Sequence, residues 1–161
     1  MPTVYLGLGT NIGNKKENLT RAIEALSLAL GNYTALSTFM ETEPWGFDSD
    51  NAFLNCVVAF DTTITPTMLL DTTESIEREL GRTTKSTGGK YHDRVIDIDI
   101  LLYGNATIET PRLTIPHPLM HLRDFVLEPL AGIAPDAMHP TTGKTIGRLA
   151  AELKEQHAQK G

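Results

Sequence analysis

The chain has 161 residues and a formal net charge of −6, with 40% hydrophobic and 21% charged residues. Length and composition are typical of a soluble globular protein with a single core, so we expect residues 1–161 to form one domain. The acidic balance argues against general nucleic-acid binding, which needs a broad positive surface. No apolar run is long enough to span a membrane, and no secretion signal precedes the first strand, so a cytoplasmic protein is expected. The single Cys56 lies in an apolar run, which predicts a buried side chain in a reducing compartment.

The first half of the chain alternates strands with one helix. Residues 3–8 read as a short buried strand that ends at a glycine-containing turn. Apolar residues at Leu19, Ile23, Leu26 and Leu30 have helical spacing, and Gly31 ends the pattern. Residues 33–42 and 52–61 are predicted strands, separated by a polar loop.

The second half begins with a helix capped by Thr65, with Pro66 at its first position and Gly81 at its end. Residues 82–93 have almost no apolar side chains and read as a long functional loop. A clear strand follows over residues 95–103, then a small hairpin within 107–115 and short helices over 118–121, 125–133 and 145–155. The order predicts an α+β fold of the ferredoxin-like class: a βαββαβ core with an antiparallel sheet, helices on one face, and a C-terminal extension.

The triplet Asp97-Ile98-Asp99 is the most informative local feature. Side chains alternate between the two faces of a strand, so Ile98 enters the core while both aspartates share the other face, with Cα atoms about 7 Å apart. Two like charges on an apolar strand are unfavourable unless cations compensate them, and carboxylates are ligands that suit Mg²⁺. An exposed sheet face with solvated aspartates remains the alternative from these residues alone.

Basic residues gather around this strand. Seven of the 14 lysines and arginines fall between positions 78 and 123, and Arg94 lies three residues before Asp97. Clustered cations are commonly just a solvated face. Carboxylates beside a cationic loop, however, are what phosphoryl transfer needs, because metal ions neutralise a polyphosphate and arginine stabilises developing charge.

Four other motifs, three for nucleotides and one for a metal, fail on inspection. Ile12 stands where a dinucleotide fingerprint needs its third glycine, and Met138 and Thr84 stand where two possible P-loops need their first. His117 and His121 have a zinc-like spacing, but no matching Glu or Cys accompanies them.

Taken together, the motifs resemble the 6-hydroxymethyl-7,8-dihydropterin pyrophosphokinase family of folate biosynthesis. The resemblance runs from Val4 to about Pro140, with its segments in the family's order. They are Tyr5-Leu6-Gly7-Leu8-Gly9-Thr10-Asn11, Thr42-Glu43-Pro44-Trp45-Gly46, Phe53-Leu54-Asn55, Glu77 with Gly81-Arg82, Arg94-Val95-Ile96-Asp97-Ile98-Asp99-Ile100-Leu101-Leu102-Tyr103-Gly104, Leu113-Thr114-Ile115-Pro116-His117-Pro118 and Arg123-Asp124-Phe125-Val126-Leu127-Glu128-Pro129-Leu130. Such enzymes transfer pyrophosphate from ATP to the pterin hydroxymethyl group and release AMP.

The resemblance also implies roles for individual residues. Asp97 and Asp99 would hold two Mg²⁺ ions, and Arg82 and Arg94 would act on the phosphates as catalytic residues. The implied ATP-binding set is Glu77, Arg82, Lys85, Tyr91, Arg94, Ile100, Arg112, Thr114, His117 and Arg123.

The implied pterin pocket places the ring between Phe53 and Phe125, framed by Thr42, Pro44 and Trp45. Asn55 would pair with the ring edge through both its amide donor and its carbonyl acceptor. From spacing alone the two phenylalanines could equally be core residues. Asn55 is harder to explain that way, because an amide inside an apolar strand needs polar partners when buried.

The sequence departs from the family pattern in the loop. Tyr91 is the nearest aromatic residue where relatives often carry tryptophan, and Thr84 and Ser86 replace basic residues. Two rival functions stay open at this point: a ligand-sensing domain without catalysis, and a metal-dependent phosphohydrolase. We expect a monomer whose partners are ATP and the pterin alone, without nucleic acid or membrane.

Overall fold

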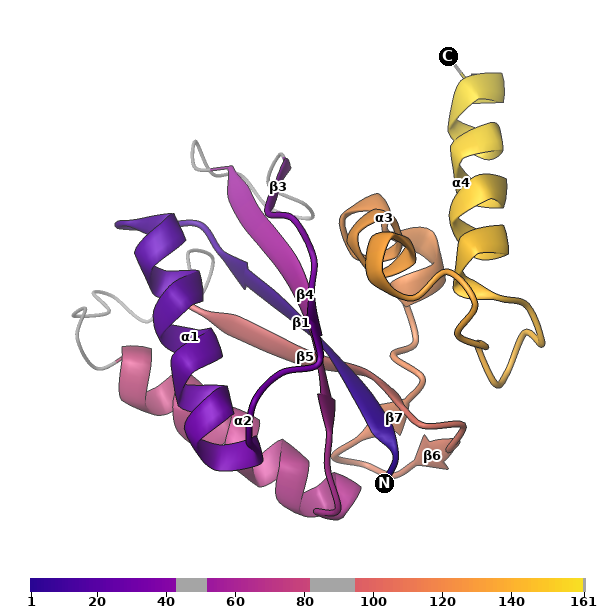
Figure 1. Ribbon diagram of the computed structural model, residues 1–161. Helices are drawn as coiled ribbons and strands as arrows, with labels where there is room; N and C mark the ends of the chain where they lie inside the picture. Colours follow the sequence, from indigo (N-terminus) through magenta and orange to yellow (C-terminus); the bar gives the residue numbers. More distant parts are fainter. Residues whose placement is uncertain (43–51, 82–94, 161) are drawn as a thin grey trace.

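The computed structural model describes residues 1–42, 52–81 and 95–160 (Figure 1). The strands are β1 (Thr3–Thr10), β2 (Ala35–Leu36), β3 (Met40–Thr42), β4 (Phe53–Asp61), β5 (Asp97–Tyr103), β6 (Ile108–Glu109) and β7 (Thr114–Ile115). The helices are α1 (Lys15–Leu30), α2 (Pro66–Gly81), η1 (Met120–Leu122), α3 (Asp124–Ile133) and α4 (Ile146–Lys160). The predicted order of elements is confirmed.

The main sheet has the strand order β2-β4-β1-β5, and β3 adds to β4 beyond β2 along the same edge. Every pairing in this sheet is antiparallel. The predicted antiparallel sheet of the ferredoxin-like class is therefore confirmed. Residues 33–42 form two short strands where one was predicted. The cause is Ser37, whose Oγ accepts a 2.8 Å hydrogen bond from the Val57 N–H in place of a backbone carbonyl.

Helices α1 and α2 cover one face of the sheet (Figure 1). The predicted Thr65 cap of α2 is confirmed, because Thr65 Oγ1 accepts from Met68 N at 3.2 Å. Asn14, which sequence analysis did not name, caps α1 in the same way by accepting from Glu17 N at 3.1 Å. The apolar positions Leu19 and Leu26 of α1 are fully buried against β-strand residues such as Leu6. This packing forms the first core.

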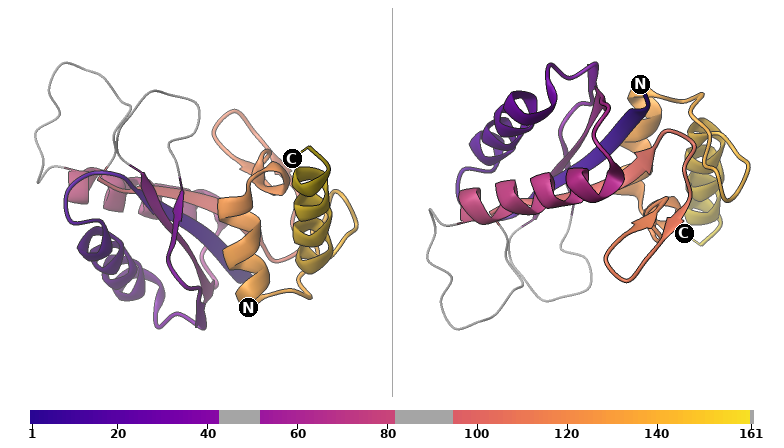
Figure 2. Two further views of the ribbon diagram at one scale, coloured as in Figure 1. Left: turned by 90° about the horizontal axis from the view of Figure 1, so that it is seen from above. Right: turned by 90° about the horizontal axis from the view of Figure 1, so that it is seen from below.

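The C-terminal extension covers part of the opposite face. Helix α3 lies against the sheet and α4 packs on α3 from outside, as both views of Figure 2 show. Leu127, Leu130 and Ile146 meet Val57 and Leu101 of the sheet in a second core. No helix in the described ranges is both long and apolar enough to cross a membrane.

The two cores fix which face each strand residue presents. Leu6 and Leu8 of β1 point to the first core, so Gly7 and Gly9, which alternate with them, belong to the second face. Asn55 lies two positions before Val57 on that second face. On this second face, the polar Asn55 and the apolar Val57 of the second core therefore belong to the same strand, β4.

Leu26→Ala should lower the free energy of unfolding by about 2–5 kcal/mol, because the side chain is fully buried and its loss leaves a cavity. Leu28 lies in the same helix but is 90% exposed, so Leu28→Ala should change stability by less than about 0.5 kcal/mol. Urea unfolding of both variants makes the comparison. Equal losses would mean that α1 packs on a different face from the one described.

Candidate active site

The acidic pair lies at the start of β5. Ile98 and Ile100 are 6% and 5% exposed in the first core, whereas Asp97 and Asp99 are only partly buried on the opposite face. The predicted alternation is thus confirmed. The two carboxylates stand side by side on the face that α1 and α2 leave open.

A third carboxylate comes from α2. Ile98 N donates a 2.8 Å hydrogen bond to Glu77 Oε2, which holds the Glu77 side chain at the strand that carries both aspartates. The pKa of Glu77 is raised to about 7, and burial of the carboxyl group is the largest cause. The hydrogen bond from Ile98 N lowers this pKa, whereas the charge of Asp97, a hydrogen bond with Asp97 and the charge of Asp99 raise it further. The three carboxylates therefore form one electrostatic unit.

His117 approaches the same unit from the segment after β7. Its backbone N–H donates to Leu101 O at 3.0 Å, which fastens this segment to β5. Because the ring Nδ1 accepts from Leu119 N at 3.3 Å, a neutral imidazole carries its proton on Nε2, and Nε2 lies 3.9 Å from Asp99 Oδ1. Burial, followed by the positive charge of Arg123, lowers the pKa of His117, while Asp97 opposes that shift. His117 is therefore a neutral donor at the edge of the acidic group.

Arg123 and Phe125 stand together at the start of α3. The Arg123 guanidinium carbon lies 5.6 Å from the centre of the Phe125 ring, within the range of a cation–π contact. The charge of Arg123 also acts on His117, so the start of α3 and the segment after β7 meet at one place. This brings a predicted pterin-stacking residue next to two predicted nucleotide residues.

Asn55 and its neighbours form the polar end of β4. Asn55 is 6% exposed, and its Nδ2 donates to Met40 O at 3.3 Å and to Thr42 Oγ1 at 3.1 Å. Phe53 pairs directly with Thr42 across β3 and β4, which gathers three predicted pterin residues. Both donor bonds of the amide thus stay inside the protein. Oδ1 is the group turned toward the site here, and the prediction that donor and acceptor of Asn55 both serve a ligand stays a prediction.

The register joins the two halves of the site. Gly9 of β1 pairs with Asn55 of β4 on one side and with Asp97 of β5 on the other. Paired residues of antiparallel strands point to the same face, with Cα atoms roughly 5 Å apart, so Asn55 and Asp97 lie about 10 Å apart across Gly9. Sequence analysis gave Gly9 no role, because its partners are 46 and 88 residues away in the chain.

The remaining nucleotide candidates are more dispersed. Arg112 Nη2 bonds to both Asp71 Oδ1 and Glu74 Oε1 at 2.8 Å, which ties the β6–β7 hairpin to α2. Ile100 lies in the first core, and Thr114 is exposed on β7. The two acids on α2 were not singled out by sequence analysis. Their spacing of three residues on one helix face is the signal that could have marked them.

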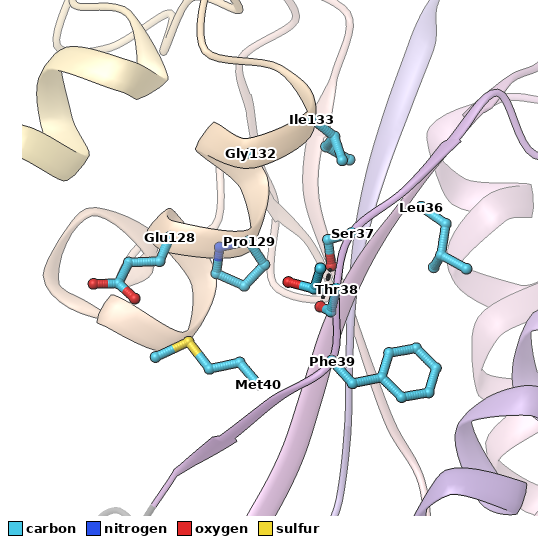
Figure 3. Close-up of a pocket in the computed structure, with 9 residues that line it drawn as sticks. All are labelled: Leu36, Ser37, Thr38, Phe39, Met40, Glu128, Pro129, Gly132 and Ile133. Atoms are coloured by element: carbon cyan, nitrogen blue, oxygen red, sulfur yellow. Dashed lines mark hydrogen bonds between the residues drawn. The ribbon is translucent and has the colours of Figure 1, made fainter.

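Two hollows flank these residues. One of about 470 Å³ runs along the β6–β7 hairpin, and its lining includes Thr114 and His117. Another of about 460 Å³ separates residues 36–40 from α3, with Glu128 as its one carboxylate (Figure 3). Among the predicted site residues that the structure describes, none lines this second hollow, so we leave it out of the site.

The other predicted site residues lie outside the described ranges. They are Pro44, Trp45, Arg82, Lys85, Tyr91 and Arg94.

Comparisons with known proteins point in one direction. A model of the family described as 7,8-dihydro-6-hydroxymethylpterin-pyrophosphokinase (HPPK) matches residues 5–135. A Porphyromonas gingivalis protein named 2-amino-4-hydroxy-6-hydroxymethyldihydropteridine pyrophosphokinase is 51% identical over 141 residues, covering 87% of this chain and 95% of the relative. A protein of the same name from Aquifex aeolicus is 40% identical over 152 residues, covering 94% of this chain and 92% of the relative.

Solved structures share the fold. A crystal structure of HPPK-DHPS in complex with substrates matches 99% of this chain with a TM-score of 0.78 at 17% identity. Plasmodium falciparum HPPK-DHPS with pteroate matches 98% with a TM-score of 0.76 at 18% identity. This chain spans 44% of each of those longer chains, so these two matches speak for the fold alone. The family match over residues 5–135 and the identity to full-length relatives decide the assignment: the chain belongs to the 7,8-dihydro-6-hydroxymethylpterin-pyrophosphokinase family.

Proposed function

We propose that this chain transfers the pyrophosphate group of ATP to the hydroxymethyl oxygen of 6-hydroxymethyl-7,8-dihydropterin in folate biosynthesis. The products are the pterin diphosphate and AMP. Family membership supports the reaction class. The observation that carries the assignment to this site is the row Asn55–Gly9–Asp97, which sets an amide acceptor and a carboxylate pair on one sheet face.

The carboxylates fit Mg²⁺. Asp97 and Asp99 are partly exposed, so oxygen atoms of water and phosphate can complete an octahedral shell around an ion held by one or two carboxylates. The described residues contain no group of three or more His, Cys, Asp or Glu that would make an all-protein metal cage. Burial is the largest cause of the raised pKa of Glu77, and the charges of Asp97 and Asp99 add to it, so a cation held by the aspartates would relieve that part of the shift. Two bound Mg²⁺ ions would supply charge neutralisation for the polyphosphate and orient the attacking hydroxyl.

Asp97 and Asp99 would bind the metal ions that in turn hold the polyphosphate. Glu77 would act indirectly, because it accepts a hydrogen bond from Ile98 N, the residue between the two aspartates, and lies beside both of them. The hydroxymethyl oxygen attacks the β-phosphorus in line, a bond to that phosphorus forms, and the bond from the β-phosphorus to the bridging oxygen breaks. The electron pair leaves with the α-phosphate of AMP, and the proton of the hydroxymethyl group is released to water.

Cationic and donor groups would bind the phosphates. His117 offers a neutral Nε2–H near Asp99, and Arg123 brings a permanent positive charge beside it. We assign Arg82 and Arg94 to the developing charge on the bridging oxygen, and Lys85 and Tyr91 to the nucleotide, on the strength of the family pattern. On the strength of the family pattern we also assign Arg112, Thr114 and Ile100 to the nucleotide, although Ile100 lies in the first core here; Arg112 would exchange its bonds to Asp71 and Glu74 for a ligand.

The pterin would bind at the other end of the row. Phe53 and Phe125 offer flat faces for the ring. Asn55 Oδ1 accepts a hydrogen bond from a ring N–H, and Thr42, Pro44 and Trp45 frame the pocket. We expect the chain to act as a monomer with ATP and the pterin as its partners. The lone Cys56 is buried and its pKa is raised to about 12, in keeping with a thiol that stays reduced in the cytoplasm.

Incubation with ATP, Mg²⁺ and the hydroxymethyl pterin should produce AMP and the pterin diphosphate in equal amounts, without ADP. Chromatographic separation of the nucleotides makes the measurement. Release of inorganic phosphate or pyrophosphate without the pterin would indicate a phosphohydrolase. Reversible binding of both substrates without AMP would indicate a sensing domain.

Asp97→Asn should reduce kcat by about 100-fold or more, because the amide removes a charge that binds metal while keeping the side chain's shape. Asp61→Asn is the matched control: Asp61 ends β4, and its role is to accept from Thr3 Oγ1 at 2.6 Å, which an amide oxygen can also do. Steady-state kinetics with both substrates and thermal unfolding check the pair. Full turnover in Asp97→Asn would remove Asp97 from the metal site.

The metal-free protein should lose stability as pH rises from about 4.5 to about 7. Because the pKa of Glu77 is raised to about 7 in the folded state, the native chain keeps a proton in this window that the unfolded chain has released. Glu77→Gln should flatten this part of the pH profile, whereas Glu79→Gln, on an exposed position of the same helix, should leave it in place. Urea unfolding in EDTA at several pH values checks it. A slope that is the same in all three proteins would contradict the described burial of Glu77.

A further inference from the structure

Gly9 leaves no room for a side chain on the site face. A Cβ added there would lie 2.9 Å from Asn55 Oδ1 and 3.6 Å from Phe53 Cδ1. The first distance is shorter than an ordinary carbon–oxygen contact, so one of the two groups would have to move. The second is ordinary packing. The conflict is therefore specific to the amide oxygen of Asn55.

The backbone does not explain this glycine. The described glycines with positive φ are Gly13, Gly31, Gly104 and Gly143, and Gly9 is not among them. Gly9 sits in a regular strand with partners on both sides, a conformation that any residue adopts. What the position requires is the empty space above its Cα.

Asn55 cannot yield that space without cost. Its Nδ2 is held by Met40 O at 3.3 Å and Thr42 Oγ1 at 3.1 Å, and the residue is 6% exposed. Rotating the amide away from a new Cβ would break these two bonds inside a buried site. A shift of β4 instead would disturb the row that leads to Asp97.

The same contacts settle which way the amide faces. Met40 O is a carbonyl and can only accept, so the Asn55 atom beside it must be the nitrogen. Oδ1 then faces the empty position of Gly9 as an acceptor. A ligand ring seated over this position is recognised by an N–H group that points at Oδ1.

We infer that Gly9 is a positioning residue for the pterin, acting through Asn55. Its missing side chain lets Asn55 Oδ1 occupy the one place where the amide both keeps its two internal bonds and meets a ring N–H. The inference rests on the proposed function for the identity of the ring. It makes Gly9 part of how the acceptor substrate is selected, a role distinct from binding ATP.

The test compares Gly9→Ala with Gly7→Ala. Gly7 lies on the same strand and face, but the three atoms nearest to a Cβ added there are side-chain carbons of Leu101, at 3.4 to 3.6 Å, which is ordinary contact. Gly9→Ala should raise the Kd and KM for the hydroxymethyl pterin by about tenfold, the scale of one disturbed hydrogen bond to a buried amide, with the KM for ATP unchanged. Gly7→Ala should change the Kd and the KM for the hydroxymethyl pterin by less than about twofold. Equal effects of the two changes, or equal effects on both substrates, would overturn the inference.

A double variant separates positioning from direct obstruction of the ring. In an Asn55→Ala background the oxygen that meets the new Cβ is gone, so adding Gly9→Ala should weaken pterin binding by less than about twofold further. A further tenfold loss would mean that the methyl group blocks the ligand itself, and would overturn the role through Asn55. If Gly9→Ala alone does not fold, folding of the double variant would support the same close contact, and failure of both would contradict it.

The binding outcomes are independent of the proposed reaction, because the Kd needs no turnover. Pterin binding is measured by equilibrium titration of the pterin's own fluorescence, without ATP. A wild-type chain that binds the pterin but forms no AMP would refute the proposed catalysis while leaving the Gly9 comparison intact. A wild-type chain that binds no pterin would refute both.

Discussion

The antiparallel register of β1 between β4 and β5 is the constraint on which the site depends. It sets Asn55, Gly9 and Asp97 in one row, so that residues from three distant parts of the chain share one sheet face. The two apolar cores hold this register, because a slip by one residue would exchange the faces of every side chain. Packing far from the site therefore determines which groups meet within it.

The two ends of the row from Asn55 to Asp97 differ in charge. One end carries three carboxylates, with Glu77 anchored to the backbone between the two aspartates. The other end carries an uncharged amide whose donor is already engaged. A polyanion brought in with cations suits the first end, and a flat ring with N–H groups suits the second. The neutral His117 and the cation Arg123 border the acidic end, where a phosphate chain would need them.

The regular parts of the fold followed from periodicity and capping. The alternation around Asp97, the Thr65 cap and the apolar face of α1 were predicted from local pattern because each depends on neighbouring residues. The break between β2 and β3 depends on one hydroxyl, Ser37, replacing a ladder partner, which no local pattern reveals. The site residues were named through family motifs, but their contacts were not. The engaged Asn55 donor, the Arg112 bonds to α2 and the space over Gly9 all depend on long-range register.

The most direct test of the account is a crystal structure of the chain with Mg²⁺, a non-hydrolysable ATP analogue and the hydroxymethyl pterin. The account predicts two ions bound by Asp97 and Asp99, the ring over Gly9 with an N–H on Asn55 Oδ1, and the hydroxymethyl oxygen in line with the β-phosphorus. Aspartates that face solvent without metal, or a ring bound away from this row, would contradict it.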